Sequence, residues 1–365
     1  MRPETIITTE TDASWAEEQL NLFRQKFDPI LSAFLAKETE AATAIRPELA
    51  ELLKVSSDFI MAGGKRLRPA FTYFGYKAAG GQDDEAILRA AVPMELVHAG
   101  ALIHDDVMDN SDIRRGNPTV HKVFEKNLGS KATGTATAIV AGDQILALAD
   151  RALSEYPHFD ERFRNARKIF DQMCVEINFG QYLDVIGNLL GVVDDDWVMK
   201  VMRFKTAGYT VEKPLLIGSV LAGADSQKQK ILSGYGVPLG IAFQIRDDIL
   251  GMFGKEAEVK KPVDSDLKEG KKTLLVIHAV GEMENQNRWE ERQRFLRILG
   301  NPELSENDYH WCQDLMTETG ALKYCEDQVE IMTEQAKMCL SRGDFGLQEK
   351  RYLLGIADYL VARKH

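Results

Sequence analysis

The stretch LIHDDVMDNSDIRRGNPTVH, residues 102–121, places four aspartates and two arginines at the end of an apolar segment that favours a helix. On a helix, Asp105 and Asp109 are four residues apart and share one face, with Asp106 one step around. Two carboxylates at this spacing repel each other unless a cation lies between them. Their oxygen ligands suit a hard cation such as Mg²⁺, which also binds phosphate oxygens. The spacing therefore indicates a magnesium site, with a solvated acidic helix end as the alternative.

Arg114 and Arg115 directly follow this acidic segment, before Gly116. Guanidinium groups pair with phosphate oxygens in a bidentate manner, so a magnesium–diphosphate site needs both the carboxylates and such cations. The two arginines therefore favour the metal site over the solvated helix end.

A second acidic cluster lies in FQIRDDILGMFG, residues 243–254. Gln244, Asp247 and Asp248 lie on one side of an otherwise apolar helix. Carboxylates inside a hydrophobic helix are costly to bury unless they are paired or bind a metal. Both a ligand set and an internal ion pair fit this cluster, and its match to the first one favours the ligand set.

A basic segment, GGKRLRP at residues 63–69, brings Lys65, Arg66 and Arg68 together after two glycines. We interpret it as an anion-binding turn, with a solvated basic turn as the alternative. It is not a P-loop, because the GxxxxGK[ST] spacing is missing. His98 lies seven residues before Asp105 on the same helical face, where a lone histidine is more often a core residue than a ligand.

Helical signals dominate the whole chain of 365 residues. Apolar residues recur at spacings of three and four, as in Leu20, Phe23 and Phe27, and strand-like alternation is nearly absent. Glycine and proline breakers divide the chain into about a dozen helices. We expect an all-α fold with one large domain over residues 1–365, in which residues 1–15 are frayed.

Composition and charge exclude several classes of protein. The formal net charge of −11 disfavours a protein whose whole surface binds nucleic acid, although a local basic patch remains compatible with it. The four cysteines have neither metal-site nor disulfide-framework spacing, and the polar N-terminus resembles no signal peptide. No uninterrupted apolar stretch reaches the length of a membrane span. We therefore expect a cytoplasmic protein without a transmembrane segment and without a nucleic-acid partner.

Seven motifs in a fixed order resemble the trans-isoprenyl diphosphate synthase (polyprenyl synthetase) family over roughly residues 20–362. They are GGKRLRP, ELVHAGALIHDDVMD with its RRG, AGDQILALA, GQYLD, KTA, FQIRDDIL and DLKEGKKT. The resemblance implies a helical bundle of the isoprenoid synthase type around a central apolar cavity. It also implies Mg²⁺, three ions per active site, and a homodimer.

The resemblance also implies roles for individual residues. The metal ligands would be Asp105, Asp106, Asp109, Asp247 and Asp248. Isopentenyl diphosphate would bind Lys65, Arg68, His98 and Arg115. The allylic diphosphate would contact Arg114, Lys205 and Lys271, with Gln181 and Asp184 completing the polar shell. Thr206 and Gln244 would face the developing carbocation.

One position departs from the family pattern. Many members have DDxxD in the second motif, but here its third acidic position is Gly251. We expect activity to survive, with Asp247 as the chief ligand of this motif.

The implied reaction is a head-to-tail condensation of isopentenyl diphosphate with an allylic diphosphate. In this family, small residues upstream of the first motif permit longer products. Here Gly100 and Ala101 are small, and either Val97 or Met94, one and two turns deeper, could form the floor of the tunnel. We therefore expect a product longer than farnesyl, namely geranylgeranyl diphosphate. The alternatives are a non-catalytic subunit of a hetero-oligomeric synthase and a class I terpene cyclase. Cyclases do not need the basic turn or His98, and silent subunits tend to lose the aspartates that this chain retains.

Overall fold

The computed structural model describes residues 10–191, 193–254 and 264–362. These residues form the expected all-α fold, and within them the strands β1 (Ile113–Arg114) and β2 (Asn117–Pro118) make a single two-stranded hairpin. The first helices are α1 (Glu10–Ile45), α2 (Pro47–Met61), α3 (Leu67–Ala78), α4 (Asp84–Met108), α5 (Val120–Leu128), α6 (Lys131–Ser154) and α7 (Glu161–Gly187). The others are α8 (Asp195–Val201), the π-helix η1 (Met202–Glu212), α9 (Lys213–Leu221), α10 (Ser226–Phe253), α12 (Ser265–Glu269), α13 (Leu274–Asn285), α14 (Trp289–Ile298), α15 (Glu306–Glu318), α16 (Ala321–Ser341) and α17 (Leu347–Val361).

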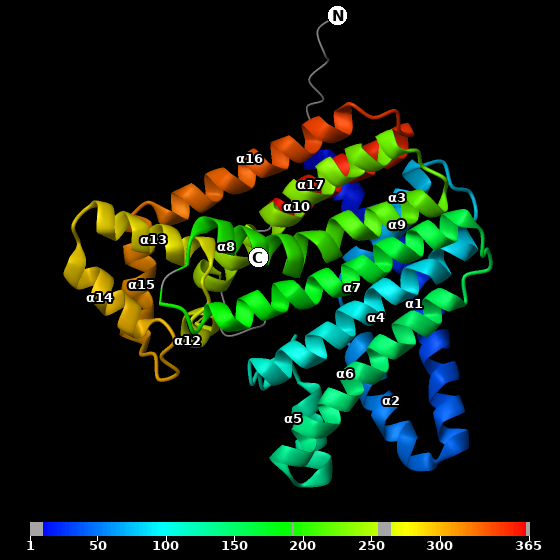
Figure 1. Ribbon diagram of the computed structural model, residues 1–365, viewed down its shortest axis with the longest axis horizontal. Coiled ribbons are helices and arrows are strands. Elements are labelled where there is room, and N and C mark those ends of the chain that lie inside the picture. The colour runs from blue at the N-terminus through cyan, green and yellow to red at the C-terminus, as the bar shows by residue number, and fades with distance from the viewer. Residues whose placement is uncertain (1–9, 192, 255–263, 363–365) are drawn as a thin grey trace, which may run out of the picture.

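Helix α4 lies in the core and packs against α3 and α6 (Figure 1). Its residues are buried on most sides, and its N-terminus is capped by Asp83, whose side chain accepts a hydrogen bond from the amide of Ala86. A Cβ atom at Gly100 would lie 2.9 Å from Cγ of Leu146 on α6. The absence of a side chain at Gly100 thus lets the backbones of α4 and α6 approach closely.

The π-helix η1 is held between α7 and α10 by glycines. A Cβ at Gly180 of α7 would lie 2.3 Å from the backbone nitrogen of Lys205, and one at Gly240 of α10 would lie 2.4 Å from Cα of Ala207. A buried ion pair joins Arg203 to Glu212 at 2.6 Å and spans the whole π-helix. These contacts fix the backbone that carries Lys205.

Two groups of buried apolar residues form the core. The larger group comes mainly from α1, α3, α4, α6, α7, α9 and α17. The smaller one comes from the C-terminal part of α10 and from α13, α15 and α16. Helix α10 contributes to both groups, and the single domain over residues 1–365 remains a prediction.

The start of α1 packs on the last helix. Arg351 of α17 donates a 2.7 Å hydrogen bond to Asp12, and its guanidinium lies 4.5 Å from the ring centre of Trp15. We predicted fraying over residues 1–15, but residues 10–15 are helical. Residues 1–9 lie outside the described part of the chain.

Two described helices, α4 and α6, are long and apolar enough to cross a membrane by length and composition. The apolar window of α4 is 78% buried inside the fold, as expected for a core helix, whereas that of α6 is 39% buried. The expectation of no transmembrane segment thus remains a prediction. The four cysteines are free thiols, and the cytoplasmic location also remains a prediction.

Candidate active site

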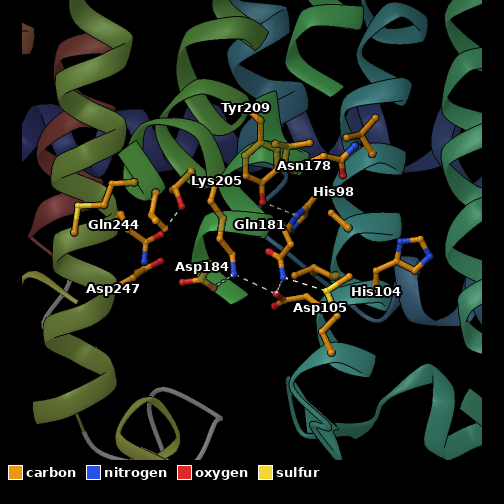
Figure 2. Close-up of a pocket in the computed structure, with 18 of the residues that line it drawn as sticks. His98, His104, Asp105, Asn178, Gln181, Asp184, Lys205, Tyr209, Gln244 and Asp247 are labelled. Carbon is orange, nitrogen blue, oxygen red and sulfur yellow. Dashed lines mark hydrogen bonds and ion pairs between the residues drawn. The ribbon is translucent and has the colours of Figure 1, made fainter. Parts of the chain in front are cut away.

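A cavity of about 790 Å³ lies between α4, α7, η1 and α10 and contains most of the residues that the sequence singled out. Figure 2 shows Gln244 and Asp247 of α10 on one side, Asp105 of α4 on the other, and Lys205 between them. The charged side chains of the motifs line one end of the cavity, and the other end is lined mainly by apolar side chains together with Asp150 and Asp171. Motifs that are distant in sequence therefore meet in one space.

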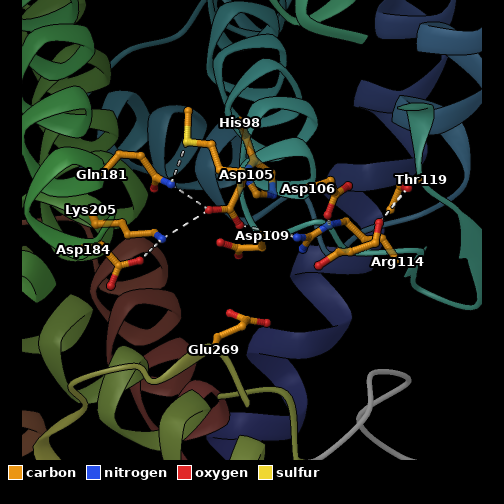
Figure 3. A network of polar contacts seen from close by, with 12 residues as sticks. His98, Asp105, Asp106, Asp109, Arg114, Thr119, Gln181, Asp184, Lys205 and Glu269 are labelled. Carbon is orange, nitrogen blue, oxygen red and sulfur yellow. Dashed lines mark hydrogen bonds and ion pairs between the residues drawn. The ribbon is translucent and has the colours of Figure 1, made fainter. Parts of the chain in front are cut away.

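Asp105 is the centre of a polar network (Figure 3). Its carboxylate accepts hydrogen bonds from Gln181 at 3.0 Å and from Lys205 at 3.2 Å, and it lies 3.5 Å from Arg114. Lys205 also donates to Asp184 at 2.5 Å. Burial alone would raise the pKa of Asp105, but the charges of Lys205, Lys271 and Arg114 outweigh it and lower that pKa. Asp105 is therefore held ionised.

The other two aspartates of the first motif differ from Asp105 in their surroundings. Asp109 ends α4 and lies 3.9 Å from Lys271, and burial together with the charge of Asp105 raises its pKa to about 6. Asp106 is 1% exposed and accepts a 2.6 Å hydrogen bond from Arg114. Neither Asp106 nor Asp109 is among the described residues that line the cavity. The structure thus places Asp105 nearest to the centre of the site.

The second motif faces the first across the cavity. Thr206 donates a 2.5 Å hydrogen bond to the carbonyl oxygen of Gln244, whose amide donates to Asp248 at 2.7 Å. Burial, followed by the negative charges of Asp266 and Asp247, raises the pKa of Asp248 well above its ordinary value. Asp247 also lines the cavity. The carboxylates of Asp247, Asp248 and Asp266 therefore repel one another on this side of the cavity.

The donor set fits a hard divalent cation. Asp105, Asp247 and Asp248 line one cavity from two facing helices and offer only oxygen atoms. As the side chains stand, no group of three or more His, Cys, Asp or Glu residues in the described chain is positioned around a single point. Lys205 and Lys271 instead contact the carboxylates of the first motif. A cation and phosphate oxygens would together satisfy both the carboxylates and the lysines.

A separate cationic group lies beside the first motif. Arg68, His98, Arg114 and Arg115 all line the cavity. Arg115 donates a 2.5 Å hydrogen bond to the carbonyl of Gly63, which brings the basic turn of α3 next to the hairpin after α4. Burial and the neighbouring arginines lower the pKa of His98 well below its ordinary value, so the imidazole is neutral. This group can bind a second anion.

Sequence reasoning missed Tyr209, which lies between Arg68 and His98. Its hydroxyl accepts a 2.6 Å hydrogen bond from Arg68 and lies 3.4 Å from Nδ1 of His98, and Arg68 lies 4.2 Å from its ring centre. The motif KTAGYT contains Tyr209, but only its first two residues had been assigned roles.

Arg66 corrects the interpretation of the basic turn. This residue has a left-handed backbone (φ 53°) and is 3% exposed. Its guanidinium pairs with Glu95 at 2.5 Å and with Asp28 at 2.9 Å. Arg66 therefore joins α1, α3 and α4 and does not bind an anion, because its buried guanidinium is already paired with two carboxylates of the chain. Lys65 lies 4.8 Å from the ring centre of Tyr359 on α17.

The apolar end of the cavity includes two of the four residues proposed to set product length. Val97 and Ala101 line it together with Leu146, Phe170 and Ile177. Met94 and Gly100 do not line it within the described residues, since Met94 is 1% exposed in the core and Gly100 packs on α6.

Comparisons with known proteins agree with this geometry. The sequence profile of the polyprenyl synthetase family matches residues 50–316. The geranylfarnesyl diphosphate synthase of Aeropyrum pernix is 37% identical over 313 residues, which cover 84% of this chain and 93% of the relative. The geranylgeranyl diphosphate synthase of Methanosarcina mazei is 35% identical over 326 residues, which cover 89% and 93%.

Among solved structures, geranylgeranyl pyrophosphate synthase from Corynebacterium glutamicum, complexed with isoprenyl diphosphate and magnesium, superposes with a TM-score of 0.89. It is 31% identical, and the match covers 94% of this chain and 99% of that one. Polyprenyl synthase from Caulobacter crescentus, complexed with calcium and isoprenyl diphosphate, gives a TM-score of 0.80 at 26% identity and covers 95% or more of both chains. With the profile match and the curated relatives, the chain belongs to the polyprenyl synthetase family.

Proposed function

We propose that this protein condenses isopentenyl diphosphate with an allylic diphosphate, head to tail and in the trans configuration. The observation that carries the proposal is the combination of three features in one cavity: two facing aspartate motifs, a separate cationic group and an apolar end. The first two features suit two diphosphates, and the third suits a growing hydrocarbon chain. The names of the synthases that this chain resembles support the same reaction.

The allylic diphosphate would bind between the aspartate motifs. Asp105, Asp247 and Asp248, which line the cavity, would hold Mg²⁺ together with Asp109 at the end of α4, and Asp106 would fix Arg114 beside them. Lys205, Lys271 and Arg114 would contact the diphosphate oxygens. Asp184 and Gln181 keep the ammonium of Lys205 and the carboxylate of Asp105 in place. The number of three ions per site remains a prediction. When bound, Mg²⁺ would neutralise negative charge on the departing diphosphate.

Isopentenyl diphosphate would bind the separate cationic group. Arg68, His98 and Arg115 line the cavity there, and Lys65 lies on the same basic turn as Arg68. A neutral His98 can donate one hydrogen bond to a phosphate oxygen without adding to the charge of the three arginines. Tyr209 orients Arg68 and His98, since its hydroxyl contacts both.

The proposed reaction needs charge stabilisation and the exclusion of water. The allylic C–O bond breaks, the alkene of isopentenyl diphosphate attacks the carbocation, and a proton is then lost to the departing diphosphate. Lys205 and Arg114 lie where negative charge would grow. Thr206 and Gln244, linked by their hydrogen bond, present polar oxygens to the carbocation. The helical walls keep water from quenching it.

We propose geranylgeranyl diphosphate as the product. Val97 and Ala101 are small for their positions on the cavity wall, and Phe170 of α7 lies farther along it. Gln181, which bonds Asp105, and Phe170 are separated on α7 by about 16 Å of helix. A chain of about three extended isoprene units, each about 5 Å long, fits this depth before the last addition.

We also propose a homodimer. Helix α7 exposes Val175, Phe179 and Tyr182, which lie at spacings of four and three on one face. Helix α6 exposes Ile139 and Val140. Exposed apolar residues on adjacent helices are typical of an interface between proteins. The replacement Phe179→Glu should convert the dimer into a monomer. Light scattering after gel filtration measures the mass of both forms.

One incubation tests the proposed activity. The protein is mixed with Mg²⁺, isopentenyl diphosphate and a series of allylic diphosphates, and product length is analysed. We expect elongation that ends at geranylgeranyl diphosphate. Absence of elongation with every primer would support a non-catalytic subunit, whereas a cyclic hydrocarbon formed without isopentenyl diphosphate would support a terpene cyclase.

A further inference from the structure

Gly251 occupies the position where many family members have the third aspartate of the second motif. It lies on α10, three residues after Asp248 and on the same side of the helix. A Cβ atom built at Gly251 would lie 2.7 Å from Oδ2 of Asp266. The space beside Gly251 is therefore already filled by a carboxylate from another part of the chain.

We propose that Asp266 of α12 supplies the third carboxylate of the second aspartate motif and so replaces in space the aspartate that is absent at position 251. This inference rests on the proposed function, because it concerns the metal–diphosphate site of that reaction.

The contacts of Asp266 direct it toward this site. Asp266 lines the same cavity as Asp247 and Asp248. Its Oδ1 lies 3.5 Å from Nζ of Lys271, and Lys271 lies 3.9 Å from Asp109 of the first motif. Asp266 is thus close to both aspartate motifs.

The short helix α12 is held firmly enough to position this carboxylate. Leu267 is 2% exposed and lies in the core, and its carbonyl accepts a 2.7 Å hydrogen bond from the amide of Gly300. Gly270 adopts a left-handed backbone (φ 75°) that ends α12, so that the amide of Lys271 can donate to the carbonyl of Asp266 at 3.0 Å. Asp266 and Lys271 are therefore oriented together.

Charge and size explain why position 251 is glycine here. A side chain at 251 would displace the carboxylate of Asp266, because its Cβ would lie 2.7 Å from Oδ2. An aspartate there would also add a second negative charge beside Asp266, in a site where like charges repel. The proposal can therefore be tested by moving the carboxylate from position 266 to position 251.

The experiment measures Mn²⁺ binding in the presence of inorganic diphosphate, by electron paramagnetic resonance of the free ion. This readout does not require condensation, so its failure is distinguishable from failure of the proposed activity. The variants are Asp266→Asn, Asp266→Ala, Gly251→Asp and the double variant Gly251→Asp/Asp266→Ala. The control is Asp264→Ala, which removes a neighbouring acid that pairs with Lys268 at 2.6 Å and does not line the cavity.

We expect Asp266→Asn and Asp266→Ala to weaken Mn²⁺ binding about tenfold, the usual scale for loss of a group that supports a metal site. The double variant should recover to within about threefold of the parent, because its carboxylate enters the space that Asp266 vacates. Gly251→Asp alone should lower the melting temperature, and Asp264→Ala should leave binding unchanged. The isosteric Asp266→Asn keeps the test valid if the alanine variant does not fold.

Two results would overturn the proposal. Unchanged Mn²⁺ binding in Asp266→Asn would show that this carboxylate does not serve the site. A folded double variant that binds as weakly as Asp266→Ala would show that Asp266 acts only by pairing with Lys271, and does not replace the aspartate absent from position 251.

Discussion

The two aspartate motifs face the same cavity but are surrounded by opposite charges. Around Asp105 lie Arg114, Lys205 and the amide of Gln181, at 3.0–3.5 Å. Burial and the charges of Asp266 and Asp247 raise the pKa of Asp248, the charge of Lys271 opposes them, and the hydrogen-bond donor to Asp248 is the neutral amide of Gln244. Asp105 is thus paired with protein cations, whereas the charge around Asp248 is mainly negative.

This difference explains how a chain with a net charge of −11 can bind two diphosphates. Several of its excess carboxylates are gathered in one place, where a divalent cation reverses their sign locally. The cations that surround Asp105 then face the same anion. The first motif therefore stabilises the departing group with protein charges as well as metal, and the second, where Lys271 only partly offsets the negative charge, depends more on the metal.

The largest expected effect follows from breaking the first motif. Asp105→Asn should lower kcat about 10³-fold, since it removes a metal ligand and leaves Lys205 and Arg114 without their shared partner. Steady-state kinetics with farnesyl diphosphate and isopentenyl diphosphate measure this loss. Asp314→Asn, at an exposed aspartate of α15, is the control and should retain parental kinetics. A kcat reduced less than tenfold in Asp105→Asn would contradict the central role of Asp105.

Removing the metal should separate the two diphosphate sites. In EDTA, we expect the affinity for an allylic diphosphate to fall about 100-fold, because the carboxylates of both motifs would then repel it. The affinity for isopentenyl diphosphate should change less than about threefold, because Arg68, His98 and Arg115 belong to the protein itself. Calorimetric titration measures both. Undiminished binding of the allylic substrate in EDTA would refute the difference between the sites.

The sequence predicted the parts of this comparison that depend on helical spacing. Asp105, Gln244 and Asp248 lie on long buried helices, where positions three and four apart share a face. Their meeting in one cavity could be expected only from the family resemblance, since it depends on packing between α4 and α10. The hydrogen bond between Thr206 and Gln244 has the same origin.

The parts that the sequence did not predict depend on backbone conformations that spacing does not reveal. Arg66 adopts a left-handed conformation, which turns its side chain into the core although its neighbours Lys65 and Arg68 lie on the same turn. Tyr209 lies in a π-helix, whose i to i+5 hydrogen bonds change which residues face the cavity. Contact between Gly251 and Asp266 joins segments that no local pattern connects.

The apolar end of the cavity can be altered without touching either motif. Ala101→Phe should shorten the main product from geranylgeranyl to farnesyl diphosphate, because a phenyl ring would block the wall shared by Ala101 and Val97. Product analysis should show kcat reduced by no more than about tenfold, since the charged end is intact. Ala101→Val is a graded control and should shorten the product less. An unchanged product in Ala101→Phe would refute the assignment of this wall.

The smallest effect concerns stability, and its sign should differ between the motifs. The lowered pKa of Asp105 means that its charge stabilises the fold at pH 7, a contribution that is lost only as pH falls through the folded-state pKa. The raised pKa of Asp248 means that its charge destabilises the fold at any pH above the unfolded-state pKa.

In EDTA at pH 7, Asp248→Asn should therefore raise the melting temperature by about 1–3 °C and Asp105→Asn should lower it by a similar amount. Scanning calorimetry measures both variants. Adding Mg²⁺ and diphosphate should abolish the advantage of Asp248→Asn, because the cation then stabilises the parental carboxylate and not the amide. If both variants changed the melting temperature in the same direction, protein cations would balance the two motifs alike. That result would refute the charge difference that we infer from the positions of Lys205 and Asp266.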